Sequence, residues 1–124
     1  ANNFAEVSLE LGGKSPFIVF EDANIESAVN ASIAGIFGAT GQSCVAGSRL
    51  YVQDGVADEF LGKIVAQAKT ITLGDPLEDA TQMGPLCTKG QLSHIKKQIT
   101  KALQEGATLL CGGEGWGDSH SLFF

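Results

Sequence analysis

The sequence has little positive charge. Its 124 residues include eight lysines and arginines against 14 aspartates and glutamates, which gives a formal net charge of −6. A surface that binds nucleic acid needs a surplus of cations on one face, and the lysines and arginines here form no cluster. Long apolar runs are also missing, because stretches such as Phe17–Phe20 fall far short of the roughly 18 residues of a membrane-spanning helix. We therefore expect neither a nucleic acid nor a membrane as a partner.

Cysteine and histidine are scarce as well. The three cysteines, Cys44, Cys87 and Cys111, are an odd number without CxxC spacing, which argues against a disulfide framework and against a zinc site. His94 and His120 lack the spacing of metal ligands, so we expect both on the surface and no bound metal. The first residues show no secretion-signal pattern. These absences predict a cytoplasmic protein in a reducing compartment.

Apolar residues, in contrast, make up 44% of the chain and charged residues 18%, which is typical of a folded globular protein. Their spacing alternates between strand-like and helix-like segments. Strands are expected over residues 15–20, 50–53 and 107–111, and amphipathic helices over residues 25–37, 56–68 and from a Thr88 cap to Gly106. This order predicts an α/β fold of alternating strands and amphipathic helices, with a mostly parallel sheet against which the helices pack.

Turns and caps separate these segments. Asp54-Gly55 is expected to form a turn between the second strand and the second helix. Thr88 and Gln91 match a capping box, in which each side chain binds the other residue's free backbone N–H. Gly106 stands where a helix often ends in the left-handed conformation.

Two segments are candidates for chemistry, and the first contains Glu10. It reads Leu9-Glu10-Leu11-Gly12-Gly13-Lys14-Ser15-Pro16. Its Gly-Lys-Ser end resembles part of a phosphate-binding loop, but Ser8 replaces the required glycine and a strand follows instead of a helix. Glu10 lies between two leucines, and apolar surroundings turn a carboxylate into a usable general base near neutral pH. The glycines that follow allow backbone or ligand to come close.

The second segment runs from Phe37 to Arg49 and contains Cys44. The preceding helix is expected to end at Gly38, just before a cysteine among small residues, a place suited to exposing a thiol and its own N–H toward a pocket. Taken alone, Cys44 also fits a small buried apolar residue, and Glu10 a surface carboxylate. Arg49 is suited either to stabilising a Cys44 thiolate by its charge or to an ion pair at the strand edge.

These two segments resemble the glutamate and cysteine signatures of the NAD(P)-dependent aldehyde dehydrogenase family. Their order and their separation of 34 residues suit that family, and the likeness continues over nearly the whole chain. The resemblance implies that Cys44 attacks an aldehyde carbonyl to form a thiohemiacetal, whose oxyanion is held partly by the Cys44 N–H. Loss of a hydride to the nicotinamide then leaves a thioester, and Glu10 activates the water that hydrolyses it to a carboxylic acid. Leu11 corresponds to a position whose backbone lies near the nicotinamide.

The resemblance also implies what surrounds this chain. Residues 1–11 are expected to end the cofactor-binding region and residues 12–124 to form part of the catalytic domain, with most of the NAD or NADP site outside the chain. The expected partners are an aldehyde substrate, the remainder of the parent enzyme and further copies in a homo-oligomer. One departure is Ala39, where the family's cysteine signature commonly has asparagine. Two alternatives stay open: a non-catalytic binding or assembly module, and an esterase-like or CoA-acylating thiol enzyme, of which Glu10 weakens the CoA version.

Overall fold

The computed structural model describes residues 3–115, 117 and 121–124, so His120 lies outside the described residues. Within them the chain forms two strands, three α-helices and one turn of 3-10 helix. In chain order these elements are β1 (Pro16–Val19), α1 (Ile25–Phe37), the 3-10 turn η1 (Gly38–Gly41), β2 (Arg49–Val52), α2 (Asp54–Ala68) and α3 (Lys89–Gln104).

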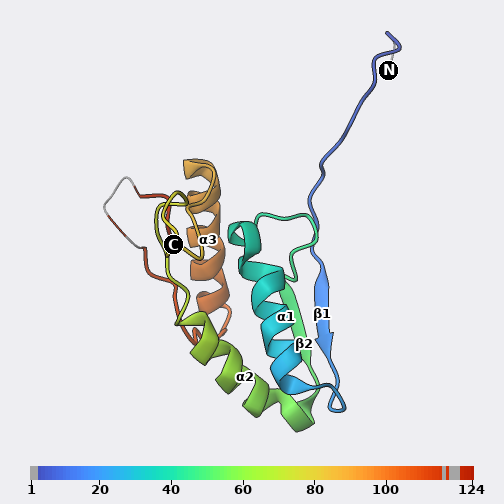
Figure 1. Ribbon diagram of the computed structural model, residues 1–124, viewed down its shortest axis with the longest axis vertical. Helices are drawn as coiled ribbons and strands as arrows, with labels where there is room; N and C mark the ends of the chain where they lie inside the picture. Colours follow the sequence, from blue (N-terminus) through green and yellow to red (C-terminus); the bar gives the residue numbers. More distant parts are fainter. Residues whose placement is uncertain (1–2, 116, 118–120) are drawn as a thin grey trace.

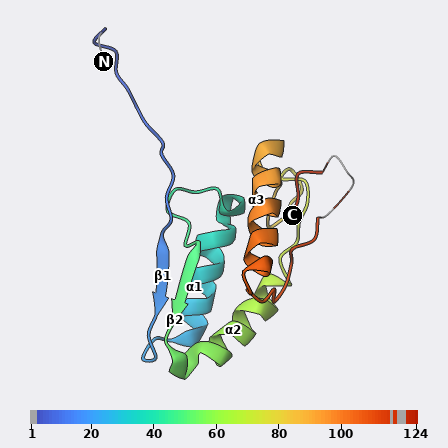
Figure 2. The same cartoon turned by 180° about the vertical axis from the view of Figure 1, so that it is seen from behind.

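The two strands form a parallel pair joined through α1. Pro16 pairs with Arg49 at one end and Val19 with Val52 at the other. Helices α1 and α2 cover one face of this pair, as the two opposite views show (Figures 1 and 2). A parallel pair cannot be closed by a tight turn, so the crossover helix is the expected connection. The prediction of an α/β fold with parallel strands is confirmed.

The core lies between this sheet face and the two helices. Phe60 of α2 is fully buried, and Val19 and Val29 are 2% and 3% exposed. Successive strand residues point to opposite faces, which explains why Ile18 and Tyr51, on the other face, stay 57% and 53% exposed. Burial of one side chain the size of phenylalanine contributes about 1.5–3 kcal/mol, so Phe60 is a principal anchor of α2.

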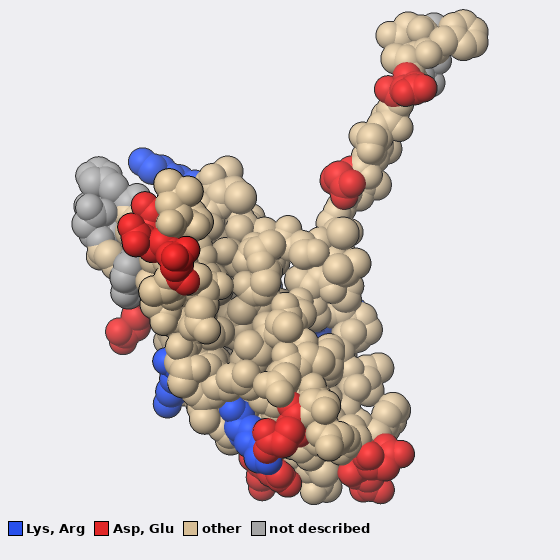
Figure 3. Space-filling view, in the orientation of Figure 1, with Lys and Arg blue, Asp and Glu red and all other residues tan. Residues whose placement is uncertain are grey.

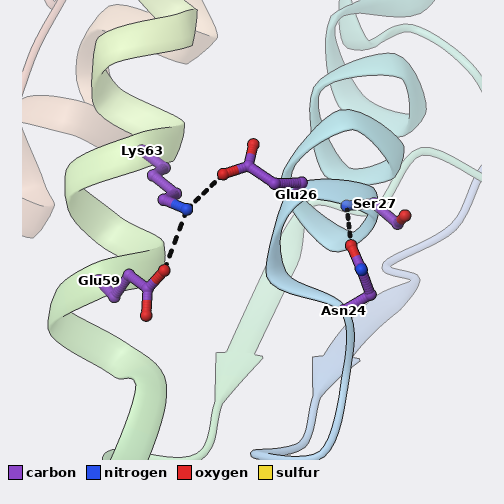
Figure 4. A network of polar contacts seen from close by, with 5 residues as sticks. All are labelled: Asn24, Glu26, Ser27, Glu59 and Lys63. Atoms are coloured by element: carbon purple, nitrogen blue, oxygen red, sulfur yellow. Dashed lines mark hydrogen bonds and ion pairs between the residues drawn. The ribbon is translucent and has the colours of Figure 1, made fainter.

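Side-chain caps define where two of the helices begin. The Asn24 Oδ1 accepts a hydrogen bond from the Ser27 N–H at 2.9 Å, ahead of α1 (Figure 4). The Thr88 Oγ1 accepts from the Gln91 N–H at 3.1 Å, ahead of α3. The Thr88 half of the expected capping box is therefore confirmed, whereas the described residues show no return bond from the Gln91 side chain. Gly106, with φ +96°, ends α3 in the predicted left-handed conformation.

Two expectations about secondary structure are wrong. Asp54-Gly55 is not a turn, because both residues lie in the first turn of α2, where the Asp54 carboxylate suits the positive end of the helix dipole. Residues 107–111 form no strand within the described part of the chain. Strands are held by a neighbouring backbone, and no described segment pairs with this one, in which Leu109 and Leu110 are about half exposed.

A surface ion-pair network joins α1 to α2. The Lys63 Nζ lies 3.0 Å from Glu59 Oε1, one turn away on α2, and also contacts Glu26 Oε1 of α1 (Figure 4). The hydrogen bond to Glu26, followed by the one to Glu59, raises the pKa of Lys63 above its ordinary value.

Among the helices of the described residues, none is both long enough and apolar enough to cross a membrane.

Candidate active site

Cys44 follows a left-handed turn at the end of α1. The φ values of Ala39, Thr40 and Gly41 are +50°, +57° and +69°. Three consecutive residues therefore lie in the left-handed region, which residues other than glycine disfavour. The chain leaves α1 through this turn and returns to β2 through a loop that carries Cys44. Cys44 is exposed there, as the sequence predicted.

The turn is fastened to a distant segment of the chain. The Thr40 Oγ1 donates to the Gly84 carbonyl at 3.1 Å, and the Gln42 Oε1 accepts from the Cys87 N–H at 3.0 Å. The backbone N–H of Gln42 also closes the turn on the Ala39 carbonyl at 3.0 Å. Sequence reasoning missed Thr40 and Gln42, because their long-range partners lie 44 and 45 residues further along the chain. No local pattern marks such a pair.

The N–H group of Cys44 has no hydrogen-bond acceptor among the described residues. The neighbouring N–H groups are used locally, since Val45 donates to the Ser43 Oγ at 3.4 Å and Ala46 donates to the Ser43 carbonyl at 3.1 Å. The thiol and the free N–H thus belong to one exposed residue. This pairing suits attack on a carbonyl group whose oxygen becomes negatively charged.

Glu10 lies on an extended arm, residues 3–15, that leaves the body of the molecule (Figure 1). The acidic side chains of this arm stand clear of the body (Figure 3). The apolar surroundings expected for Glu10 are not formed by the described residues, because Leu9 and Leu11 are 69% and 85% exposed. In an extended chain these two leucines point to one side and Glu10 to the other, so neither encloses the carboxylate.

The arm that carries Glu10 contacts the loop that carries Cys44 through Gly13. A Cβ placed on Gly13 would lie 2.4 Å from the Cys44 carbonyl oxygen, so only glycine fits there without a shift of the backbone. The close approach that the sequence predicted is therefore confirmed for Gly13. The side chains of Glu10 and Cys44 share no hydrogen bond within the described part of the chain.

Arg49 joins the same two segments. Its Nε donates to the Lys14 carbonyl at 3.0 Å, and its Nη2 donates to the same oxygen. Of the two roles that the sequence left open for Arg49, the ion pair at the strand edge is not formed, because Arg49 contacts no carboxylate among the described residues. A carbonyl oxygen is the acceptor within reach, since Arg49 pairs with Pro16 and Lys14 lies two residues before it.

The other candidate groups lie apart from this junction. Cys87 is exposed and Cys111 is half-buried. His94 is exposed, and the described residues contain no cluster of His, Cys, Asp and Glu that fits a metal ion. Three of the hollows on the described surface are mainly apolar, and neither Cys44 nor Glu10 lines any of them.

These features correspond to the aldehyde dehydrogenase family. The sequence model of that family matches residues 1–124. The chain therefore belongs to the aldehyde dehydrogenase family, as its sequence motifs predicted.

Three known proteins illustrate the similarity. The (Z)-2-((N-methylformamido)methylene)-5-hydroxybutyrolactone dehydrogenase of Acinetobacter baylyi is 52% identical over 114 residues, which cover 92% of this chain and 23% of that protein. Aldehyde dehydrogenase 9 of Polyandrocarpa misakiensis is 49% identical over 94% of this chain and 51% of its own length. The crystal structure of betaine aldehyde dehydrogenase from Staphylococcus aureus in complex with NAD+ superposes with a TM-score of 0.90 at 37% identity, covering 99% of this chain and 25% of that one. The chain thus spans from about a quarter to about half of the length of these relatives.

Proposed function

We propose that this chain is the part of a longer aldehyde dehydrogenase that carries the nucleophile Cys44 and the general base Glu10. The enzyme would oxidise an aldehyde to a carboxylic acid with NAD(P)+. The observation that carries the proposal is the contact of Gly13 with the Cys44 carbonyl, which brings the root of the glutamate segment against the cysteine loop. Family membership and the short span of the chain relative to its relatives support it.

The first step uses Cys44 alone. Its thiolate attacks the aldehyde carbon, a C–S bond forms, and the electron pair of the carbonyl bond moves to the oxygen. The Cys44 N–H, which has no acceptor among the described residues, donates to that oxyanion. When bound, NAD(P)+ supplies the acceptor for the hydride that the substrate carbon must lose.

The second step uses Glu10. A thioester on Cys44 is broken when water attacks its carbonyl carbon and the C–S bond releases the Cys44 thiolate. Glu10 takes the proton from the attacking water, and the product leaves as a carboxylic acid. Glu10 has to face the cysteine loop for this task, and the exposed arm leaves it free to be set by residues beyond this chain.

The described residues fit one edge of a nicotinamide site. Leu11 is 85% exposed, and a Cβ on Gly12 would meet no atom within 4 Å, so backbone there is open to a bound group. Residues 1–11 would end the cofactor-binding region and residues 12–124 would begin the catalytic domain. The divergence of the arm from the body supports a boundary at this place (Figure 1).

The surroundings of the enzyme follow from the exposed surface. Ile18, Phe20 and Tyr51 leave one face of the strand pair apolar and more than half exposed. The remainder of the parent enzyme and a second copy of the chain would cover such surfaces, which supports a homo-oligomer. The three cysteines are free thiols, which supports a reducing, cytoplasmic location.

The test uses the full-length protein that contains this chain. Cys44→Ser should reduce aldehyde-dependent formation of NAD(P)H by ~10³-fold or more, because the nucleophile is removed. Glu10→Gln should lower steady-state turnover by roughly 10²-fold while a first, stoichiometric burst of NAD(P)H remains, because only thioester hydrolysis is slowed. Cys87→Ser is the matched control and should keep normal turnover. Full activity of Cys44→Ser would refute the assignment.

A further inference from the structure

Arg49 donates several hydrogen bonds to the end of the arm that adjoins β1, at Lys14 and Ser15. Its guanidinium Nε and Nη2 both donate to the Lys14 carbonyl, and its backbone N–H donates to the Ser15 carbonyl at 3.4 Å. Two consecutive carbonyl groups of the arm are thus held by one residue. Arg49 itself begins β2, five positions after Cys44, and belongs to the same segment as the thiol.

Among the described residues, the backbone hydrogen bonds between the two strands reach no further along the arm than the Ser15 carbonyl. Pro16 pairs with Arg49 in register, and the Arg49 N–H donates to the Ser15 carbonyl, so the nitrogen of Pro16 faces away from β2 and its missing N–H costs this ladder no bond. The N–H groups of the Arg49 side chain extend the attachment by one residue, from the Ser15 carbonyl to the Lys14 carbonyl.

This attachment sets where the arm starts relative to the thiol. Lys14 is adjacent to Gly13, whose Cα is packed against the Cys44 carbonyl. Glu10 lies three residues before Gly13, a reach of roughly 10 Å in an extended chain. An arm whose root was free to swing would carry Glu10 away from Cys44 without any change at the thiol itself.

We propose that Arg49 is a positioning residue that holds the Glu10 arm beside Cys44. This inference rests on the proposed function, since it assigns Arg49 to the step in which Glu10 takes a proton from water during hydrolysis of the Cys44 thioester. The guanidinium acts through the Lys14 carbonyl, to which both its donors point, and not through its charge on the Cys44 thiolate.

The experiment compares Arg49→Met and Arg49→Lys with the unchanged full-length enzyme. Arg49→Met keeps a long side chain but removes every side-chain donor, and should lower kcat about tenfold while the burst of NAD(P)H keeps its rate and amplitude. Mass spectrometry of the quenched enzyme should then find the acyl group accumulated on Cys44. Arg49→Lys retains the charge but lacks the planar arrangement of donors. Its kcat should therefore lie between that of Arg49→Met and that of the unchanged enzyme. Lys97→Met, which removes an exposed cation of α3, is the control and should leave kcat unchanged.

A charge role for Arg49 predicts the opposite pattern. In that case Arg49→Met would slow the burst as much as turnover, would shift the pH profile of Cys44 alkylation by iodoacetamide, and Arg49→Lys would behave as wild type. Either that pattern or an unchanged kcat in Arg49→Met overturns the proposal. If Arg49→Met does not fold, the decision rests on Arg49→Lys, because a wild-type kcat there contradicts the two-donor attachment. Failure of the proposed function is distinguishable, since the wild-type burst would then be absent or would survive in Cys44→Ser.

Discussion

Gly13 packs so closely against Cys44 that a methyl group added to its Cα would lie 2.4 Å from the Cys44 carbonyl oxygen. The neighbour is backbone and not the end of a flexible side chain, so it cannot move aside without moving the loop. The segment that carries the candidate base and the loop that carries the candidate nucleophile are therefore joined through their main chains.

The first prediction concerns this contact. Gly13→Ala should destabilise the full-length protein by about 1–3 kcal/mol, because the added Cβ has to push the two segments apart. The apparent midpoint temperature of thermal unfolding shows whether the substitution lowers or raises the stability. Gly62→Ala is the control, since a Cβ there meets nothing within 4 Å and an alanine inside α2 should stabilise the helix by up to about 1 kcal/mol. Equal effects of the two substitutions would contradict the close contact.

The second prediction concerns the left-handed turn before Cys44. Ala39 has φ +50°, a conformation that costs a residue with a Cβ about 1–2 kcal/mol and that asparagine or glycine tolerates. Ala39→Gly should therefore be neutral or stabilising, whereas Ala34→Gly, the same change inside α1, should cost about 1 kcal/mol. Both variants gain the same conformational freedom in the unfolded chain. The difference between their unfolding midpoints therefore reports the cost of the backbone conformation at the two positions in the folded protein. A midpoint that falls equally in both would argue against the turn.

The third prediction concerns the tie between Thr40 and Gly84. Thr40→Val removes the donor to the Gly84 carbonyl but keeps the shape of the side chain, and should cost about 1 kcal/mol. Thr40→Ser keeps the donor and removes the branched methyl group, so it should be at least as stable as the wild type. Thermal unfolding of the two variants side by side is the measurement, and equal loss in both would show that the hydroxyl group is unimportant.

The fourth prediction concerns the pH dependence of the Lys63 network. Because the pKa of Lys63 is raised in the folded chain, its contribution to stability is present below the ordinary lysine value of about 10.4 and is lost as the pH rises through the folded-state pKa. The stability difference between the wild type and Lys63→Met should therefore be constant near about pH 8 and shrink as the pH rises above about 10.4. Added salt should reduce it as well, since both carboxylates are exposed. A difference that grows with alkaline pH would contradict the network.

Much of the helical structure could be predicted from local pattern. The apolar spacing over residues 25–37 placed α1 with its observed bounds, and Thr88 and Gly106 marked the limits of α3. These features depend on residues within one or two helical turns of one another. The prediction failed at residues 107–111, where the apolar run is strand-like but no strand among the described residues pairs with it.

The sequence by itself determined the family and the order of the helices and strands as far as α3, because signature residues and apolar periodicity are local properties of the chain. It also named Cys44, Glu10 and Leu11, whose roles stay predictions. Only the tertiary structure decided what holds the cysteine loop: Lys14 bound by Arg49, Gly84 by Thr40 and Cys87 by Gln42, at separations of 35, 44 and 45 residues. Such contacts form when packing of α1 and α2 on the strands brings distant backbone groups together, and no short stretch of sequence encodes them.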